Sequence, residues 1–299
     1  MIRKTLILFF SIIYCIQAQP NPLVSKDSLA QKQWVDSIYA TLSVEEKIGQ
    51  LFIPMVRPLS DNTKHVEDMI RMVEDSHLGG VVFSTGHPYL QTTILNQLQS
   101  KAKIPLLATL DGEWGVGMRM DSVMDFPWNL TLGAIQDNQL IYEIGKRIGE
   151  QHLRMGLQMN YAPVLDVNIN PLNPIIGNRS FGEDPENVTA KGLAMMRGLR
   201  DAGVLTSGKH FPGHGRTTMD SHISLPTIKA NLESLQEIEL KPFQMAIDNG
   251  APMIMSGHLV VPALEKTKKD WPATFSKAIL DDLLRKKMKF KGVIVTDSL

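Results

Sequence analysis

The feature that most constrains the fold is an alternation of short apolar runs with segments of helical periodicity, which continues from residue 51 to residue 297. Apolar runs that alternate with amphipathic helices are typical of a parallel sheet with helices packed outside it. A chain of 299 residues is long enough for one large domain of this class. The predicted strands cover residues 51–56, 79–84, 105–111, 157–164, 204–210, 252–257 and 292–297.

Capping signals mark the helices between these runs. Ser43 and Glu46 form a capping-box pattern. Asp184 followed by Pro185 is typical of a helix start, and we expect that helix to stop at Gly203. Further helices are predicted over residues 64–77, 88–101 and 137–155, from Asn231 to about Gly250, and from Ser276 to about Met288.

Two closures of such a sheet compete, an open doubly wound sheet and a (β/α)8 barrel. An open sheet concentrates its chemistry at one switch point, whereas a barrel spreads it over the ends of many strands. Here polar candidates follow several strands, namely Asp111, Asp166, Lys209, His210, His258 and Asp297. We therefore predict an α/β fold of the (β/α)8 TIM-barrel type.

The strand count is seven, and the chain stops two residues after the last predicted strand. We interpret the sequence as a barrel truncated after its seventh strand. The alternative is a strand that this count misses, near residues 130–135.

The first 18 residues have the order of a secretory signal peptide, with a short basic stretch, an apolar run and a small residue, Ala18, before the expected cleavage point. We therefore expect an exported bacterial protein, periplasmic or extracellular, with no membrane span after removal of the leader. Residues 19–39 are expected to form an N-terminal arm, irregular at least to Gln31, and residues 40–299 the barrel.

Charge and cysteine content narrow the function classes. Lys plus Arg and Asp plus Glu both number 31, so no overall field draws the chain to nucleic acid. The only cysteine, Cys15, lies in the predicted leader. The mature chain is therefore expected to have no disulfide and no catalytic thiol. The oligomeric state is not predicted.

The segment from Lys209 to His222 is the densest in chemistry-bearing side chains, with three histidines, a lysine and an aspartate. Asp220 and His222 are spaced so that a carboxylate can hold one imidazole nitrogen and leave the other free for proton transfer. A structural loop whose histidines only bond the backbone is the alternative. His210 and His214 are separated by Phe-Pro-Gly, which is not helical, so we expect no metal or other cofactor there.

Five segments, in order, resemble glycoside hydrolase family 3, and specifically its bacterial β-N-acetylglucosaminidase branch. The resemblance covers roughly residues 40–299. The segments are Leu110–Gly115 with Arg119, Tyr161–Asp166, Gly177–Pro185, Lys209–Pro226 and Gly292–Ser298.

This resemblance implies a retaining exo-β-N-acetylglucosaminidase that acts on peptidoglycan-derived or chitin-type oligosaccharides through a covalent glycosyl-enzyme. Asp297 corresponds to the nucleophile and His222, backed by Asp220, to the acid/base. The positions implied to bind sugar hydroxyls are Asp111, Arg119, Arg179, Lys209 and His210.

Three other functions stay open from the sequence. They are a different β-glycosidase of the same family, a Schiff-base lyase that uses Lys209, and a non-catalytic module that binds cell-wall sugar. Trp114 and Arg216 depart from the family pattern, which leaves the preference for the leaving group open. Asp166 and His258 are explained equally by a place in the site and by a structural hydrogen bond.

Overall fold

The computed structural model describes residues 27–299, so the predicted signal peptide and residues 19–26 of the predicted arm lie outside it. Its centre is a sheet of seven parallel strands whose order in space follows the sequence. The strands are β1 (Met55–Val56), β2 (Gly80–Phe83), β3 (Leu107–Leu110), β4 (Met159–Asn160), β5 (Leu205–Phe211), β6 (Met253–Ser256) and β7 (Val293–Thr296).

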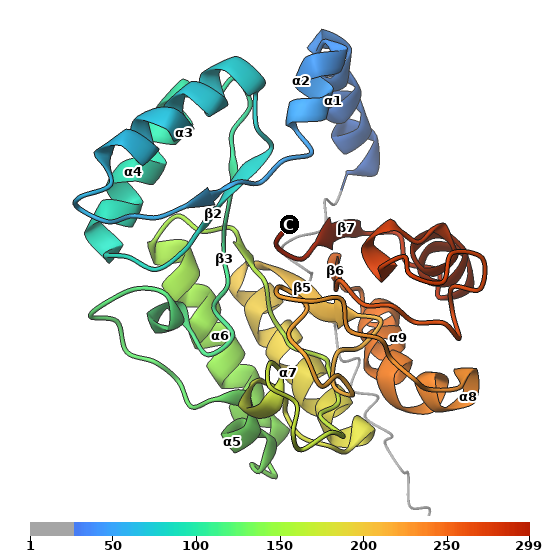
Figure 1. Ribbon diagram of the computed structural model, residues 1–299. Helices are drawn as coiled ribbons and strands as arrows, with labels where there is room; N and C mark the ends of the chain where they lie inside the picture. The colour runs from blue at the N-terminus through green and yellow to red at the C-terminus, as the bar shows by residue number, and fades with distance from the viewer. Residues whose placement is uncertain (1–26) are drawn as a thin grey trace, which may run out of the picture.

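Helices follow most strands and pack outside them (Figure 1). The α-helices are α1 (Ser28–Thr41), α2 (Val44–Gly49), α3 (Thr63–Ser76), α4 (Pro88–Lys101), α5 (Asn129–Gly133), α6 (Asn138–Arg154), α7 (Pro185–Ala202), α8 (Leu232–Ser234) and α9 (Leu240–Asp248). Short 3-10 helices are η1 (Val116–Met118), η2 (Gly177–Arg179) and η4 (Ala273–Phe275), and π-helical segments are η3 (Leu235–Glu239) and η5 (Ala278–Lys287).

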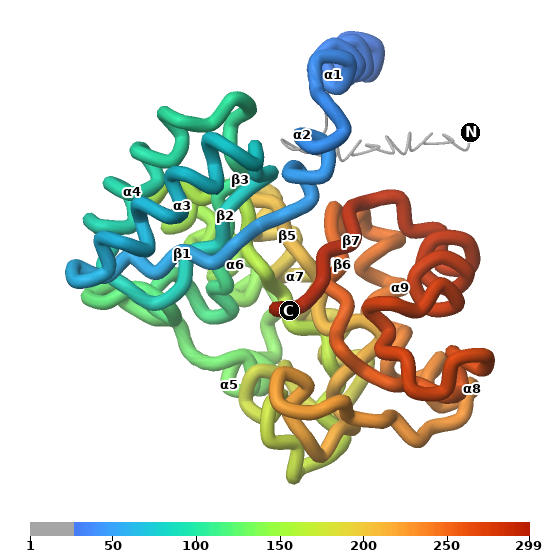
Figure 2. The backbone as a smooth tube through the Cα atoms, turned by 45° about the horizontal axis from the view of Figure 1, so that its top comes forward, coloured from blue at the N-terminus to red at the C-terminus, as the bar shows by residue number. Residues whose placement is uncertain are grey.

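The sheet curls into a half-barrel, as the path of the chain from β1 round to β7 shows in Figure 2. The side chains of each strand alternate between two layers, because successive side chains of a strand point to opposite faces of the sheet. Val81 and Ile254 pack with the outer helices, whereas Val82, Met253 and Met255 pack together on the other face. The predicted α/β barrel class is confirmed, with β1 and β7 as the two edges of the sheet.

The local signals for helix boundaries are confirmed. The Ser43–Glu46 capping box forms at the start of α2. Asp184 accepts the amide hydrogens of the first turn of α7, which ends at Gly203 with φ 97°. The helices predicted from Asn231 and Ser276 also form, although η3 and η5 within them are π-helical.

Most predicted strands are slightly shorter than expected, and β1 and β4 are much shorter. Leu51 and Phe52 are 80% and 58% exposed. Their amides donate to the carbonyl oxygens of Ile48 and Gly49 at the end of α2, so these residues do not pair with a neighbouring strand. Pro54 adds no amide donor. Near β4, Pro163 likewise lacks a donor, and residue 164 rejoins the sheet only through an isolated bridge.

The N-terminal prediction needs a correction as well. Residues 28–31, expected to be irregular, are the first turn of α1, because the Asp27 side chain accepts the amide hydrogen of Ala30 and caps the helix. None of the residues of α1 is buried, and α1 and α2 project from the body of the molecule in Figure 1. The alternative strand near residues 130–135 is wrong, since α5 occupies that segment. Within residues 27–299, no helix has the length and apolar character that a membrane crossing requires.

Candidate active site

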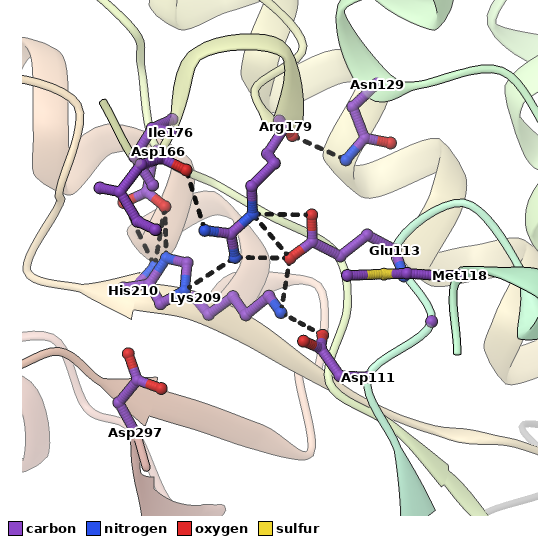
Figure 3. A network of polar contacts seen from close by, with 12 residues as sticks. Asp111, Glu113, Met118, Asn129, Asp166, Ile176, Arg179, Lys209, His210 and Asp297 are labelled. Atoms are coloured by element: carbon purple, nitrogen blue, oxygen red, sulfur yellow. Dashed lines mark hydrogen bonds and ion pairs between the residues drawn. The ribbon is translucent and has the colours of Figure 1, made fainter. Parts of the chain in front are cut away.

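The predicted site residues meet at the carboxyl ends of the strands, where Figure 3 shows most of them. Asp111 directly follows β3, and Asp297 directly follows β7. Lys209 and His210 lie near the end of β5. This is the edge at which (β/α)8 barrels carry their chemistry.

Lys209 is the centre of a buried ionic cluster. Its side chain is 2% exposed, and its Nζ lies 2.5 Å from Asp111 Oδ1 and 2.7 Å from Glu113 Oε1. Arg119 adds a second cation, with Nη2 2.5 Å from Asp111 Oδ2. Burial alone would raise the pKa of Asp111, but Lys209 and Arg119 outweigh it and hold that pKa well below its usual range.

Glu113 is a site residue that the sequence reasoning missed. It is buried, and Arg179 Nη2 donates to its Oε1 at 2.6 Å while Arg179 Nε lies 3.1 Å from both oxygens. The available signal was the spacing, because Glu113 follows Asp111 by two residues in the D-x-E segment. We call Asp111, Glu113, Arg119, Arg179 and Lys209 the ionic cluster.

Two successive residues of β5 reach the site, at an irregularity of the strand. The pairing with β6 is irregular between Gly208 and Phe211. In a regular strand Lys209 and His210 would point to opposite faces. Here Lys209 contacts the ionic cluster while His210 Nε2 lies 3.3 Å from Arg179 Nη2.

Asp166 fixes the position of His210 through hydrogen bonds. Its Oδ2 lies 2.6 Å from His210 Nδ1, and its carboxylate also accepts the amide hydrogens of His210 and His214. An arginine only donates, so His210 Nε2 accepts from Arg179 and the ring proton sits on Nδ1. Asp166 therefore both anchors the end of β5 and sets the tautomer of a predicted sugar-binding residue.

The predicted catalytic pair forms on the exposed loop of residues 218–225, which we call the dyad loop. His222 Nδ1 lies 2.8 Å from Asp220 Oδ1, which also accepts the His222 amide hydrogen. His222 Nε2 points toward the predicted nucleophile and lies 3.5 Å from Asp297 Oδ1. The structure thus brings Asp220, His222 and Asp297 together, although they come from two loops.

The two carboxylate oxygens of Asp297 have different surroundings. Ser298 donates its amide hydrogen to Oδ1 at 2.8 Å, whereas Oδ2 is buried and has no hydrogen-bond partner among the described residues. Burial favours the neutral acid, but the contact with His222 outweighs it and holds the pKa of Asp297 well below its usual range. The same contact, helped by Asp220, raises the pKa of His222 to about 9.

His258, which the sequence left open, holds the chain behind Asp297. Its Nδ1 lies 2.9 Å from Thr274 Oγ1 and its Nε2 lies 2.9 Å from the Ser298 carbonyl oxygen. It therefore supports the residue that follows the predicted nucleophile. Among residues 27–299, no cluster of three or more His, Cys, Asp or Glu side chains is arranged to hold a metal ion.

The two departures from the family pattern have different surroundings. Arg216 turns away from the site, pairing with Glu239 of η3 and donating to Ser234 Oγ at 2.6 Å. A direct effect of Arg216 on the leaving group is therefore not supported by its contacts. Trp114 stacks on Trp128, with ring centroids 4.7 Å apart and planes 12° apart, so its ring packs against a neighbouring indole.

Comparison with known proteins agrees with this geometry. Residues 43–299 match the model of the glycosyl hydrolase family 3 N-terminal domain. β-Hexosaminidase A of Pseudoalteromonas piscicida is 39% identical over 93% of this chain, which spans 49% of that protein. The chain thus has about half the length of this relative.

Solved structures give the same result. A family 3 β-N-acetylglucosaminidase from Paenibacillus superposes with a TM-score of 0.80 at 37% identity, covering 87% of this chain and 50% of the other. A β-glucoside phosphorylase in complex with a fluorinated glucose superposes with a TM-score of 0.85 at 28% identity, covering 91% and 50%. On its sequence match and its fold, this chain belongs to glycoside hydrolase family 3.

Proposed function

We propose that the chain carries the catalytic centre of a retaining exo-β-N-acetylglucosaminidase that acts on peptidoglycan-derived or chitin-type oligosaccharides. The observation that carries this proposal is the contact between Asp297 and His222 Nε2. Asp297 Oδ2 has no hydrogen-bond partner in the described part of the chain, and Asp220 holds His222 Nδ1. A nucleophile beside a proton donor is what a double displacement at a sugar carbon requires.

In the first step, Asp297 Oδ2 attacks the anomeric carbon while the proton on His222 Nε2 moves to the glycosidic oxygen. The bond from the anomeric carbon to that oxygen breaks, and the leaving sugar departs as an alcohol. Retaining glycosidases that use two carboxyl groups hold them about 5 Å apart, because the reacting atoms lie between them. The 3.5 Å contact between His222 and Asp297 must therefore lengthen when a substrate enters.

In the second step His222 must act as a base, and this requires its pKa to fall. The contact with Asp297 is the largest influence that raises the pKa of His222. Once Asp297 becomes a neutral ester, that influence is lost and the pKa of His222 falls. His222 can then take a proton from the water that attacks the anomeric carbon and releases Asp297.

The ionic cluster and His210 are proposed to bind the hydroxyls of the terminal sugar. Lys209, Arg119 and Arg179 supply charged donors, and the carboxylates between them accept from hydroxyls. The proposed preference for N-acetylglucosamine rests on similar proteins, several of which are β-hexosaminidases.

The test is hydrolysis of 4-nitrophenyl N-acetyl-β-glucosaminide by the full chain, its Asp297→Ala variant and its His222→Ala variant. We expect turnover that Asp297→Ala abolishes, and a covalent adduct on Asp297 when a 5-fluoro glycoside traps the intermediate. A folded wild-type protein that binds the sugar without turnover would support the cell-wall binding module. A preference for the β-glucoside would point to another β-glycosidase.

The acceptor is tested in the same assay, because one similar structure is that of a phosphorylase. Hydrolysis predicts free N-acetylglucosamine at the same rate with and without phosphate. A sugar phosphate that forms only with phosphate present would replace water by phosphate as the acceptor.

We also propose that the protein is exported, on the basis of the leader pattern in residues 1–18. The expected result is a mature chain that starts close to Gln19 and is recovered outside the cytoplasm. Amino-terminal sequencing of the expressed protein checks it, and an intact Met1 would contradict the proposal.

A further inference from the structure

The dyad loop is attached to the rest of the molecule at very few points. Within the described part of the chain, the hydrogen bonds of residues 218–225 are internal to the loop except one, between Ser221 and His214. Among residues 27–299, the only other polar contact that leaves the loop is that of His222 with Asp297. The placement of the proposed acid/base therefore depends on a single internal tether.

Ser221 has the burial that such a tether needs. It is 8% exposed, whereas Ile223 is 85% exposed and Met219 is 45% exposed. Ser221 lies between Asp220 and His222 in the sequence, so whatever holds its hydroxyl also limits the positions of both neighbours. The partner is His214 Nε2, at 3.0 Å.

The direction of the bonds around His214 follows from its neighbours. Thr217 Oγ1 donates its hydrogen to the His214 carbonyl oxygen at 3.0 Å. Thr217 Oγ1 therefore accepts from His214 Nδ1, which lies 2.6 Å from it. Asn173 also donates to Thr217 Oγ1, at 3.3 Å. With its proton on Nδ1, His214 has only a lone pair at Nε2, and the Ser221 hydroxyl must donate to it.

The surroundings keep His214 in this one state. It is buried, and burial together with the neighbouring His210 lowers the pKa of His214 to about 4, so the ring is neutral near pH 7. Its backbone amide donates to Asp166 Oδ1 at 2.6 Å. The side of the tether away from the loop is thus fixed by buried groups of the barrel.

We propose that His214 is a positioning residue which, through the Ser221 hydroxyl, holds the Asp220–His222 pair over Asp297. This inference rests on the proposed function, since it concerns the geometry of proton transfer by His222. Neither His214 nor Ser221 touches the reacting atoms. Because Asp166 also holds His210, one carboxylate aligns the proposed sugar-binding residue with the tether of the acid/base.

The experiment uses Ser221→Ala in the full chain, because removing one hydroxyl disturbs the fold less than replacing buried His214. The readout is kcat/KM for two aryl N-acetyl-β-glucosaminides, one with a phenol and one with a dinitrophenol leaving group. A poor leaving group needs protonation and a good one does not. We expect kcat/KM to fall about 10- to 100-fold for the phenyl substrate, the scale of a misplaced catalytic group, and less than about threefold for the dinitrophenyl substrate.

Two further variants separate positioning from loss of stability. Ser276→Ala is the matched control, because Ser276 is also buried and donates to Glu265 Oε2 at 2.6 Å, outside the site. It should lower the melting temperature without changing the ratio of the two kcat/KM values. Ser221→Thr keeps a hydroxyl and should restore the ratio toward that of the wild type.

Each result separates the positioning inference from the proposed function. If Ser221→Ala lowers kcat/KM equally for both substrates, the hydrogen bond between Ser221 and His214 has only a structural role. If kcat/KM falls for neither substrate, the loop does not need this hydrogen bond. Both outcomes leave the proposed function intact. If His222→Ala itself fails to distinguish the two substrates, the acid/base assignment is wrong and the proposed function fails first.

Discussion

The two halves of the active site are held in place by different means. Lys209 and Glu113 at the centre of the ionic cluster are buried, and each charge of the cluster contacts at least one charge of opposite sign. The dyad loop is exposed, and His222 keeps 41% of its side-chain surface accessible. Its link to the interior is one hydrogen bond from Ser221.

This difference shows where rigidity and movement are needed. The groups proposed to bind sugar hydroxyls are already in place, so little ordering has to accompany binding. The proposed proton donor must instead approach the leaving oxygen and later a water molecule, so a lightly held loop suits it. Changes in the cluster should therefore affect the fold and binding, and changes in the loop should affect only the chemical step.

The largest effect is expected from Lys209→Met, which leaves Asp111 and Glu113 facing each other without the cation between them. Breaking a buried ion pair by removing one partner costs about 3–5 kcal/mol. We expect the free energy of unfolding in urea to fall by this amount and turnover to vanish. The control is Lys286→Met, since Lys286 pairs with Asp282 on the surface, and its denaturation midpoint should not move. Equal midpoints for the two variants would contradict the comparison.

The next effect is expected from His222→Ala. General acid catalysis contributes about 10²- to 10⁴-fold, so kcat/KM on the phenyl substrate should drop within that range. Because the side chain is exposed and packs little, the denaturation midpoint should equal that of the wild type. A clear loss of stability would show that the dyad loop is part of the structural core.

A smaller effect is expected from Glu113→Gln. The amide keeps the shape but removes the negative charge between Lys209 and Arg179. Hydrogen bonds to charged groups contribute about 1.5–3 kcal/mol to stability, and we expect the free energy of unfolding to fall by an amount of this order. KM should rise while the ratio of phenyl to dinitrophenyl kcat/KM stays constant. A changed ratio would mean that the cluster also positions the acid/base.

The smallest effect is a difference in pH dependence: the ionic cluster should control stability at low pH, and the dyad loop should control kcat/KM at high pH. Burial alone would raise the pKa values of Asp111 and Glu113, but Lys209 lowers both below their unfolded values of 3.8 and 4.5. The stability that they contribute is therefore present above those values and is lost as the pH falls further. His222 has a raised pKa of about 9, so the protonated acid, and with it kcat/KM, is lost as the pH rises through 9.

Asp220→Asn sharpens this prediction. Without the Asp220 charge the pKa of His222 falls, although the larger influence of Asp297 remains, so the alkaline limb of the kcat/KM profile should move to lower pH. The acid unfolding curve should not move. NMR titration of the His222 ring measures the shift directly, and an unchanged ring pKa would contradict the assigned pairing.

Local patterns predicted most of the fold. The helix over residues 88–101 was predicted with the bounds that it has, because Pro88 opens it and apolar periodicity runs through it. Strands were harder, since an apolar run such as 51–56 does not reveal that the amides of Leu51 and Phe52 bond the preceding helix. Helical hydrogen bonds are local in sequence, whereas strand length depends on distant partners.

The site was predicted residue by residue, but its connections were not. The sequence placed Asp111, Lys209, His210 and Asp297 at strand ends, where the structure has them. It missed Glu113, whose partner Arg179 lies 66 residues away. The register shift in β5 could not be read from side-chain types, because it arises from pairing with β6.

The sparse attachment of the dyad loop has a consequence for evolution and for engineering. The proposed proton transfer resides in residues 218–225, which within the described part of the chain share one hydrogen bond with the barrel apart from the contact with Asp297. Such a segment can be exchanged for another that carries a different acid, while the determinants of sugar recognition stay untouched. The groups proposed for sugar binding and for proton transfer thus lie on separate segments, which are linked through the contacts of Asp166 with His210 and His214.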